Sequence, residues 1–207
     1  MRFSYKVVLG LLFGISFQSH ITAQTTIENF TGTDEMVVEA WFFKGITEDY
    51  RFNIFSLNEV VHNYDSEENI FLSYTVFGYD VWKGFGPLLG ARLVEGRSSG
   101  LAGIQYAKGG DRFLLTTNFS AEIRENPFLE RYLLTQYRFP LTDQLNFFGQ
   151  FQNSTNFNED AHSFSLQRLR VGLSWKKLQF GVGLNSYQFG DNWDFDSNQG
   201  GIARLEF

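Results

Sequence analysis

Hydrophobic and polar residues alternate with a period of two along most of the chain after about residue 34. Such alternation places the two kinds of side chain on opposite faces of an extended strand. Between residues 112 and 123, one face consists of Phe113, Leu115, Thr117, Phe119, Ala121 and Ile123. Helical spacing would scatter the Phe residues around the axis instead. The pattern therefore predicts β-strands of about ten residues.

Turn-forming residues separate these segments and define the predicted strands. The segments cover residues 36–43, 50–58, 69–80, 87–95, 99–107, 112–123, 128–139, 144–152, 163–175, 177–187 and 200–207. Bacterial single-chain barrels have an even number of strands, so we expect one more strand at residues 25–31. The predicted fold is all-β: a closed antiparallel transmembrane β-barrel of twelve strands, with ten strands as the alternative.

Connecting segments alternate between short turns and longer or acidic loops. The short ones are residues 44–48, 83–86, 108–111, 140–143 and 176–177, and the long ones are 59–68, 153–162 and 191–199. Outer-membrane barrels have short periplasmic turns and longer external loops. This sorting favours a membrane barrel over a soluble β-sandwich.

The first residues have the layout of a secretory signal peptide. Arg2 and Lys6 are followed by an apolar stretch at residues 7–17 and then by polar residues. That stretch is too short to span a bilayer as a helix. We expect residues 1–24 to be a signal peptide, with cleavage after Ala23 or Gln24, and residues 25–207 to form a single barrel domain.

Composition narrows the class further. The 207 residues include 24 Phe and no Cys, so a disulfide framework or thiolate metal site is impossible. A net charge of −6 argues against a nucleic-acid partner. The sequence indicates no cofactor. Abundant Phe in a chain that is polar on average predicts an aromatic outside and a polar inside.

The chain ends on Phe207, and Ala203 and Leu205 share its face of the last predicted strand. This ending resembles the C-terminal strand signal of Gram-negative outer-membrane β-barrel proteins. The resemblance implies location in the outer membrane, delivery by the barrel-assembly machinery, contact with membrane lipid and lipopolysaccharide, and a monomer. Pro140-Leu141-Thr142-Asp143 followed by Asn156-Phe157 also resembles a turn and loop of nucleoside-specific channels.

Histidine-based catalysis receives little support from the sequence. Only His62 and His162 remain after the expected cleavage, and both fall in expected loops. The segment from His162 to Ser165 lacks the His-x-Ser spacing that places both side chains on one strand face. We therefore expect two solvated loop histidines and no enzyme.

One acidic cluster has partial metal-site character. Asp191, Asp194, Asp196 and Asn198 begin with the alternating oxygens of a calcium loop, but Gln199 and Leu205 occupy the positions of its Gly and closing Glu. We expect an acidic external loop rather than a metal site.

Charged residues of both signs fall on the predicted lumen face. The candidates for a lumen constriction are Arg92, Arg112, Glu122, Arg138, Arg168 and Arg170. Arg168 and Arg170 lie two residues apart on one face, so their charges add at one level. If Glu122 and its neighbours pair with them, the lumen is filled; if water surrounds them, they favour anions.

Two principal functions follow. The first is a small passive channel for polar or anionic solutes. The alternative is a non-conducting structural or interaction barrel with a filled lumen. An outer-membrane enzyme is the third class and the least supported.

Overall fold

The computed structural model describes residues 23–49, 51–66, 69–110, 112–158 and 161–207. Residues 1–22 of the predicted signal peptide lie outside the described residues. The last two positions of that predicted segment, Ala23 and Gln24, belong to the first strand. Gln24 also contributes a side-chain contact, because its Nε2 donates to Glu206 Oε1 at 2.9 Å.

The structure consists of twelve β-strands. They are β1 (Ala23–Gly32), β2 (Glu35–Gly45), β3 (Phe52–Asn63), β4 (Asn69–Tyr79), β5 (Phe85–Val94), β6 (Arg97–Gly110), β7 (Phe113–Glu122), β8 (Leu129–Pro140), β9 (Leu145–Phe157), β10 (His162–Trp175), β11 (Leu178–Phe189) and β12 (Asp194–Glu206).

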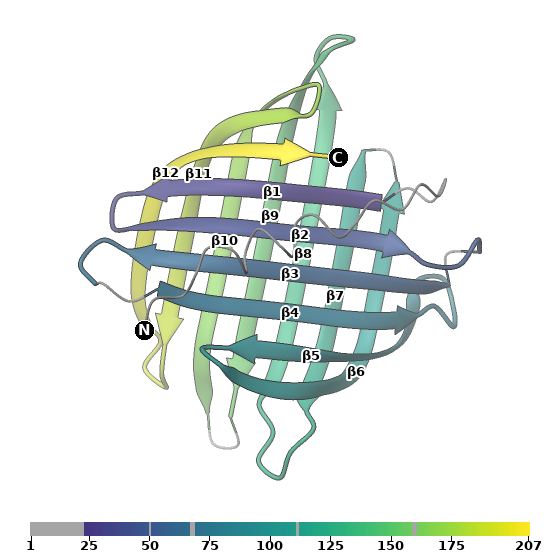
Figure 1. The fold of residues 1–207 in the computed structure, drawn as a ribbon, viewed down its shortest axis with the longest axis vertical. Coiled ribbons are helices and arrows are strands. Elements are labelled where there is room, and N and C mark those ends of the chain that lie inside the picture. Colours follow the sequence, from purple (N-terminus) through teal and green to yellow (C-terminus); the bar gives the residue numbers. More distant parts are fainter. Residues whose placement is uncertain (1–22, 50, 67–68, 111, 159–160) are drawn as a thin grey trace.

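Each strand pairs antiparallel with its neighbours in sequence, and β1 pairs with β12 to close a barrel (Figure 1). Closure gives every strand two partners, as the hydrocarbon core of a membrane requires. The predicted twelve-strand barrel is confirmed, including the strand expected at residues 25–31. That strand lies within β1 and pairs with β2 and β12.

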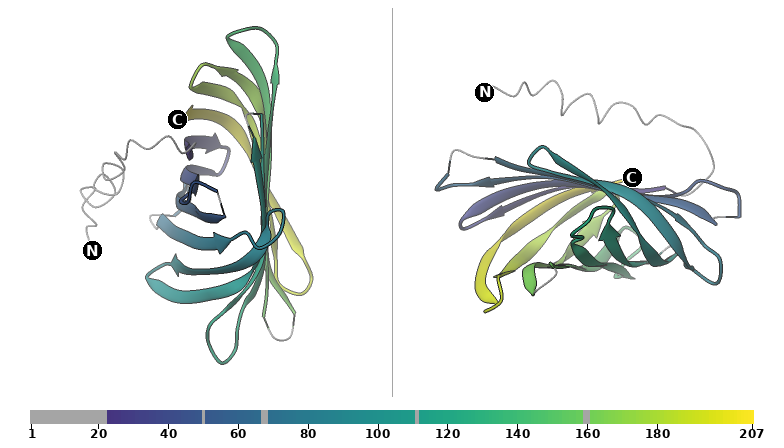
Figure 2. Two further views of the ribbon diagram at one scale, coloured as in Figure 1. Left: turned by 90° about the vertical axis from the view of Figure 1, so that its right-hand side faces the viewer. Right: turned by 90° about the horizontal axis from the view of Figure 1, so that it is seen from below.

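The barrel is flattened into two walls that lie one over the other (Figure 2). In Figure 1, β1 to β5 run across the view, whereas β7 to β10 run nearly along it. The two walls therefore cross steeply. Flattening brings opposite walls close enough for side chains on one to pack against side chains on the other.

Several connections are shorter than the sequence predicted. β3 continues to Asn63, β9 to Phe157, and β12 begins at Asp194. The expected long loops at 59–68, 153–162 and 191–199 are therefore largely strand. Their polar residues extend the sheet beyond the membrane, where an apolar face is not required, and so the lipid-type alternation stops before the strand does.

Two turns show how local chemistry ends the strands. Lys176 and Lys177 form the predicted two-residue turn between β10 and β11, with Lys176 at φ 55°. In the turn after β2, Asp49 Oδ1 accepts bonds from the Thr47 hydroxyl at 2.6 Å and from the Arg51 backbone N–H at 3.1 Å. These bonds, the Thr47 bond foremost, lower the pKa of the Asp49 carboxyl.

The outward face carries the apolar band that the alternation predicted. Phe119, Ile104, Leu173 and Val182 are all exposed on it, with Val182 61% exposed. Trp175 and Phe207 lie at the end of the barrel where β1 begins and β12 ends. Bacterial barrels keep this end on the periplasmic side, which makes the opposite end external. Among the described residues, no helix is long and apolar enough to cross a membrane.

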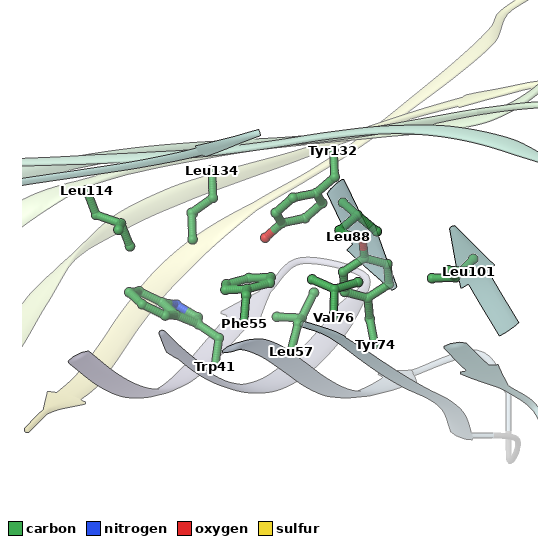
Figure 3. Close-up of a cluster of buried hydrophobic side chains, with 10 residues drawn as sticks. All are labelled: Trp41, Phe55, Leu57, Tyr74, Val76, Leu88, Leu101, Leu114, Tyr132 and Leu134. Atoms are coloured by element: carbon green, nitrogen blue, oxygen red, sulfur yellow. The ribbon is translucent and has the colours of Figure 1, made fainter. Parts of the chain in front are cut away.

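The lumen contains an apolar core that the sequence did not predict. Ten buried residues form it: Trp41, Phe55, Leu57, Tyr74, Val76, Leu88, Leu101, Leu114, Tyr132 and Leu134. Figure 3 shows Tyr132 and Leu134 on one wall facing Phe55 and its neighbours on the other. The Phe55 and Tyr132 ring centroids lie 5.5 Å apart. The expectation of a polar inside therefore fails along this part of the barrel.

Candidate functional site

Arg168 on β10 is a fully enclosed predicted site residue. Its side chain is 2% exposed, and its Nη1 donates to Glu39 Oε2 at 2.7 Å and to Glu59 Oε2 at 2.5 Å. Glu39 and Glu59 face each other across the β2–β3 pairing. Arg168 therefore ties one wall of the flattened barrel to the other.

Arg170 forms a second bridge, through Glu28 on β1. Its Nε donates to Glu28 Oε1 at 2.7 Å, and Arg204 Nε donates to Glu28 Oε2 at 2.9 Å. The guanidinium carbon of Arg170 lies 4.5 Å from the ring centroid of Phe30. The guanidinium carbon of Arg204 lies 5.3 Å from that of Phe148. Both arginines are thus held by one carboxylate and by aromatic faces.

Charges compensate within this central network. Arg168, Arg170 and Arg204 face Glu28, Glu39 and Glu59, so three guanidinium groups meet three carboxylates. All six residues are buried. Desolvation makes an unpaired charge very unfavourable here, which explains why the acids and arginines balance.

Glu206 is the centre of a group of interacting polar side chains near the periplasmic end. It pairs with Arg138 and accepts bonds from Gln24, Gln136 and Gln179. Arg138 therefore lies on the lumen side, and its side chain is 27% exposed.

A separate network lies toward the external end of the lumen. Arg92 pairs with Glu122 and with Glu130, the latter at 3.5 Å. Glu122 Oε2 also lies 2.7 Å from Arg124 Nε. Arg92 and Glu122 therefore lie on the lumen side and pair with each other.

Two expectations for the lumen are wrong. Glu122 does not pair with Arg168 or Arg170, whose partners are Glu39, Glu59 and Glu28. Arg112 does not face the lumen, because it is an exposed turn residue between β6 and β7. Its position just before the strand makes the alternation a poor guide to its direction.

Sequence reasoning missed Glu28 and Glu59 for different reasons. Glu28 lies in the weakly patterned β1, and Glu59 was assigned to a loop because of the acidic residues that follow it. The available signal was an acid two residues from a buried apolar residue on the same strand. Glu28 stands in this relation to Phe30, and Glu59 stands in it to Leu57. Extending the period of two by one more step would have placed Glu59 in the lumen.

The acidic cluster near the end of the chain is mostly strand. Asp194, Asp196 and Asn198 lie in β12, and Asp191 lies in the preceding turn. The buried Asn198 side chain is occupied by the β1–β2 turn, accepting from Thr33 Oγ1 at 3.0 Å and Asp34 N at 3.2 Å. Within the described part of the chain, no group of three His, Cys, Asp or Glu side chains is placed to hold a metal ion.

The two histidines are strand residues rather than loop residues. His62 lies in β3, with Nδ1 2.9 Å from Asn69 Oδ1. His162 begins β10 and is only 4% exposed. An irregularity in the β9–β10 register between His162 and Phe164 rotates His162 toward Ser165. The inference from spacing that these two side chains cannot share a face is therefore wrong.

His162 and Ser165 form a hydrogen-bonded pair on the outward face. The imidazole Nε2 lies 2.9 Å from Ser165 Oγ, and Nδ1 lies 2.8 Å from the backbone oxygen of Gly190. Trp193 stacks on the imidazole, with ring centroids 3.6 Å apart and planes 12° apart. Strand phase makes the face outward, because Arg168 points into the lumen and Ser165 is three residues away.

A hollow of about 400 Å³ opens beside this pair on the outward face. Its lining includes the apolar rings of Phe151, Phe157 and Trp193. Its polar lining residues are Arg131, Asn153, Thr155, Ser165, Gln167 and Gln188. Arg131 is exposed, and its Nη1 donates to Asn153 Oδ1 at 3.3 Å. The hollow therefore joins one cationic group, several amides and a hydroxyl to an apolar rim.

The proposed assembly residues lie where the barrel closes. Phe207 exchanges backbone hydrogen bonds with Thr25, at 2.9 and 3.2 Å. Leu205 and Phe207 are exposed on the outward side. The segment 140–143 forms a turn as expected, whereas Asn156 and Phe157 lie in β9 and not in a loop.

Comparisons with known proteins were made by sequence and by structure. No protein-family model and no curated protein sequence matches the chain. Solved structures that resemble it are membrane barrels. LpxR from Salmonella typhimurium has 7% identity and a TM-score of 0.48, with 90% of this chain and 100% of that chain covered.

Two further structures are OprD from Pseudomonas aeruginosa and OmpT, an outer membrane protein of Vibrio cholerae. OprD has 12% identity and a TM-score of 0.41, over 82% of this chain and 59% of that chain. OmpT in its trimer form has 6% identity and a TM-score of 0.35, over 90% of this chain and 99% of that chain. The strand pairing and outward apolar band of the chain itself establish its architecture. The chain is a closed twelve-strand β-barrel with the architecture of outer-membrane barrels.

Proposed function

We propose that this barrel is sealed: its lumen is filled by side chains, and it acts as a non-conducting structural or interaction protein of the outer membrane. The observation that carries the proposal is the pairing of Arg168 with Glu39 and Glu59. These two arms of the network reach from β10 to β2 and β3, across the space that a channel would leave to water.

The apolar cluster supports the same function. Leu134 and Trp41 are 0% and 1% exposed, so the lumen beside β2 to β8 excludes solvent. Water-filled barrels have a polar interior instead. A polar solute crossing here would lose its hydration against leucine and aromatic side chains, with few groups to replace it.

Charge balance also argues against an anion-preferring constriction. Arg168 and Arg170 add their charges only if no acid neutralises them, and here Glu28, Glu39 and Glu59 lie within hydrogen-bond distance. The net field at this level is small. A channel built on these arginines would have to break the ion pairs before it could select anions.

A passive channel for polar or anionic solutes is the second candidate. Among the described residues, Nε and Nη2 of Arg168 are buried without a hydrogen-bond partner. Buried donors of this kind are usually satisfied by water. Connected water along the lumen would be the starting point of a conducting path.

Single-channel recording in a planar bilayer tests the proposal. The folded barrel, identified by heat-modifiable migration on a detergent gel, should give no steady conductance. The double variant Arg168→Ser/Arg170→Ser should also be silent, because the apolar cluster stays in place. Steady conductance by the folded wild-type barrel, with anion preference that falls in the double variant, would establish the channel instead.

The proposed surroundings of the barrel are outer-membrane lipid and lipopolysaccharide, with insertion by the barrel-assembly machinery and a monomeric state. The outward apolar band supports the lipid contact, and Phe207, directly after β12, supports the assembly route. We propose no nucleic-acid partner and no cofactor.

A further inference from the structure

The His162–Ser165 pair lies at the level of the membrane where lipid esters are found. Ser165 precedes Trp175 by ten residues on β10. Ten residues span about 33 Å of strand, or about 25 Å across the membrane at a typical tilt of about 40°. The apolar band of such barrels is about 25 Å tall. Ser165 is therefore at its external edge, where acyl chains join their polar headgroups by carboxylic esters.

Outward side chains change character at this level. On β10, Leu169, Val171 and Leu173 face outward below it, Gln167 faces outward just below it, and Ser165 faces outward at it. On β9, Phe151 is followed outward by Asn153 and Thr155. At the same end of β7, the last outward residue is Ala121 instead, and Ile123 follows just beyond the strand. The polar outward stretch on β9 and β10 therefore has no counterpart at the same end of β7.

The hydrogen bonds of His162 fix which ring nitrogen carries the proton. The Gly190 carbonyl oxygen can only accept, so Nδ1 must donate to it. In the neutral ring Nε2 is then bare, and it lies 2.9 Å from Ser165 Oγ, within reach to accept the proton of that hydroxyl, which also contacts Thr155 Oγ1. This is the arrangement in which an imidazole removes a serine proton while a third group orients the ring.

Packing holds the imidazole in that orientation. Trp193 covers one face of the ring, and Phe157 meets it edge-on with centroids 5.9 Å apart. Ser165 itself is 1% exposed overall, yet it lines the outward hollow. A base and a nucleophile enclosed by aromatic rings are shielded from bulk water, which strengthens electrostatic interactions between them and a bound ester.

We propose that Ser165 and His162 are a nucleophile and general base that cleave carboxylic esters of phosphate-bearing lipids at the external edge of the membrane. The hollow would take the ester with its acyl chain against Phe151 and Phe157. Arg131, the cationic residue of its lining, would bind the lipid phosphate. This inference uses the outward face and is independent of whether the lumen is sealed.

The reaction proceeds in two balanced halves. Ser165 Oγ attacks the ester carbonyl carbon while His162 Nε2 takes the hydroxyl proton. The bond from that carbon to the alcohol oxygen breaks, and the leaving alcohol receives the proton from Nε2, which leaves an acyl group on Ser165. Water then attacks the acyl carbon, gives a proton to Nε2 and releases a fatty acid, and the proton returns to Ser165 Oγ.

The Thr155 hydroxyl and the Asn153 amide line the same hollow. Thr155 Oγ1 lies 3.1 Å from Ser165 Oγ, and Asn153 Nδ2 lies 3.4 Å from Thr155 Oγ1. Thr155 therefore contacts the proposed nucleophile directly, and Asn153 holds Thr155 in place from the other side.

Covalent labelling tests the nucleophile directly. The folded barrel in detergent is treated with an alkyl fluorophosphonate, which forms a bond from serine Oγ to phosphorus as fluoride leaves. Peptide mass spectrometry should place the adduct on Ser165. Ser165→Ala should abolish it, and His162→Gln should slow it by at least about a hundredfold. Ser163→Ala, a neighbouring serine outside the hollow, should label as the wild type does.

Lipid substrates distinguish the two sources of a phosphate-bearing ester. Free fatty acid is measured from vesicles of phosphatidylethanolamine and phosphatidylglycerol, and separately from lipopolysaccharide. The proposal is supported if fatty acid is released from one of the two lipid preparations and if Ser165→Ala loses that release while its heat-modifiable migration shows a folded barrel. The preparation that is hydrolysed identifies the lipid. Arg131→Gln should raise KM for that lipid by a larger factor than it raises KM for an uncharged p-nitrophenyl ester.

Two results would overturn the proposal. One is folded wild-type barrel that gives neither an adduct on Ser165 nor fatty acid from either lipid, which would leave the pair a structural hydrogen bond. The other is fatty-acid release that persists unchanged in Ser165→Ala. Neither result bears on conductance, so failure here is distinct from failure of the sealed-barrel function.

Discussion

Arg168 and Glu59 meet inside the barrel at 2.5 Å, although 109 positions separate them in the sequence. Glu39 shares the same guanidinium nitrogen at 2.7 Å. One arginine on β10 thus fixes the distance between the two walls at the level of β2 and β3. These ion pairs therefore stabilise the folded barrel and hold the two walls in a fixed position relative to each other.

Replacing Arg168 and Arg170 together by Ser should destabilise the folded barrel. The change leaves Glu39 and Glu59 without their cation, and Glu28 with Arg204 alone. Removing one partner of a buried ion pair typically costs about 3–5 kcal/mol. Thermal unfolding followed by heat-modifiable migration should show a lower midpoint. A midpoint equal to that of the wild type would mean that water already solvates these acids, as in an open lumen.

The fold was largely predictable because lipid imposes a strict alternation. At residues 113–123 every second side chain had to be compatible with hydrocarbon, so strand and outward face were both readable. The lumen was less predictable because two kinds of filling, apolar and ionic, satisfy it equally. Leu114 and Leu134 occupy inward positions where a polar residue was expected. In the flattened barrel they are core residues that pack against the opposite wall.

Pairings across the barrel could not be predicted from the pattern. The partners of Arg168 depend on which inward residues of β2 and β3 reach its level, and therefore on the register of every strand between them. The His162–Ser165 contact was missed for a local reason. It requires an irregularity at the start of β10, and a strict period of two places the pair on opposite faces.

Leu134→Ala should reveal the apolar part of the lumen as a packed core. Leu134 is 0% exposed, and truncating such a side chain to Ala typically costs about 2–5 kcal/mol. Leu133→Ala, on the outward face of the same strand, is the matched control and should cost less because lipid fills the space. Urea unfolding in vesicles measures both. Equal losses, or none at Leu134, would contradict a close-packed lumen.

Val182→Arg tests the position of the membrane. Val182 is 61% exposed and pairs with Val171, midway along the apolar part of β10 and β11. Arg at the bilayer midplane should cost about 2–4 kcal/mol. Ser197→Arg, also outward but at the external end of β12, should cost at most about 1 kcal/mol. The free energy of unfolding in vesicles separates the two, and similar costs would mean that this face does not cross hydrocarbon.

Gly181→Ala tests the close approach of β10 and β11. A Cβ at Gly181 would lie 2.1 Å from the backbone oxygen of Val171 and 2.7 Å from the Cα of Gly172. The backbones would have to separate, and overpacking of this kind typically costs about 1–3 kcal/mol. Gly201→Ala is the control, since a Cβ there meets nothing within 4 Å. The thermal midpoint should fall only for Gly181→Ala.

Deleting Phe207 should impair closure of the barrel rather than the stability of its interior. The Phe207 backbone N–H donates to Thr25 O at 2.9 Å and its oxygen accepts from Thr25 N at 3.2 Å, so the last residue completes the β1–β12 seam. Its ring is 55% exposed and lies 5.1 Å from Lys177 Nζ, outside the buried networks. We therefore expect cells producing the deletion variant to accumulate unfolded precursor, measured as the fraction of protein without heat-modifiable migration. Phe207→Tyr keeps the aromatic ring and the backbone pair and should assemble as the wild type does. If the deletion variant assembles with normal yield, the β1–β12 seam closes without the terminal residue, and the assembly signal must lie in the rest of β12.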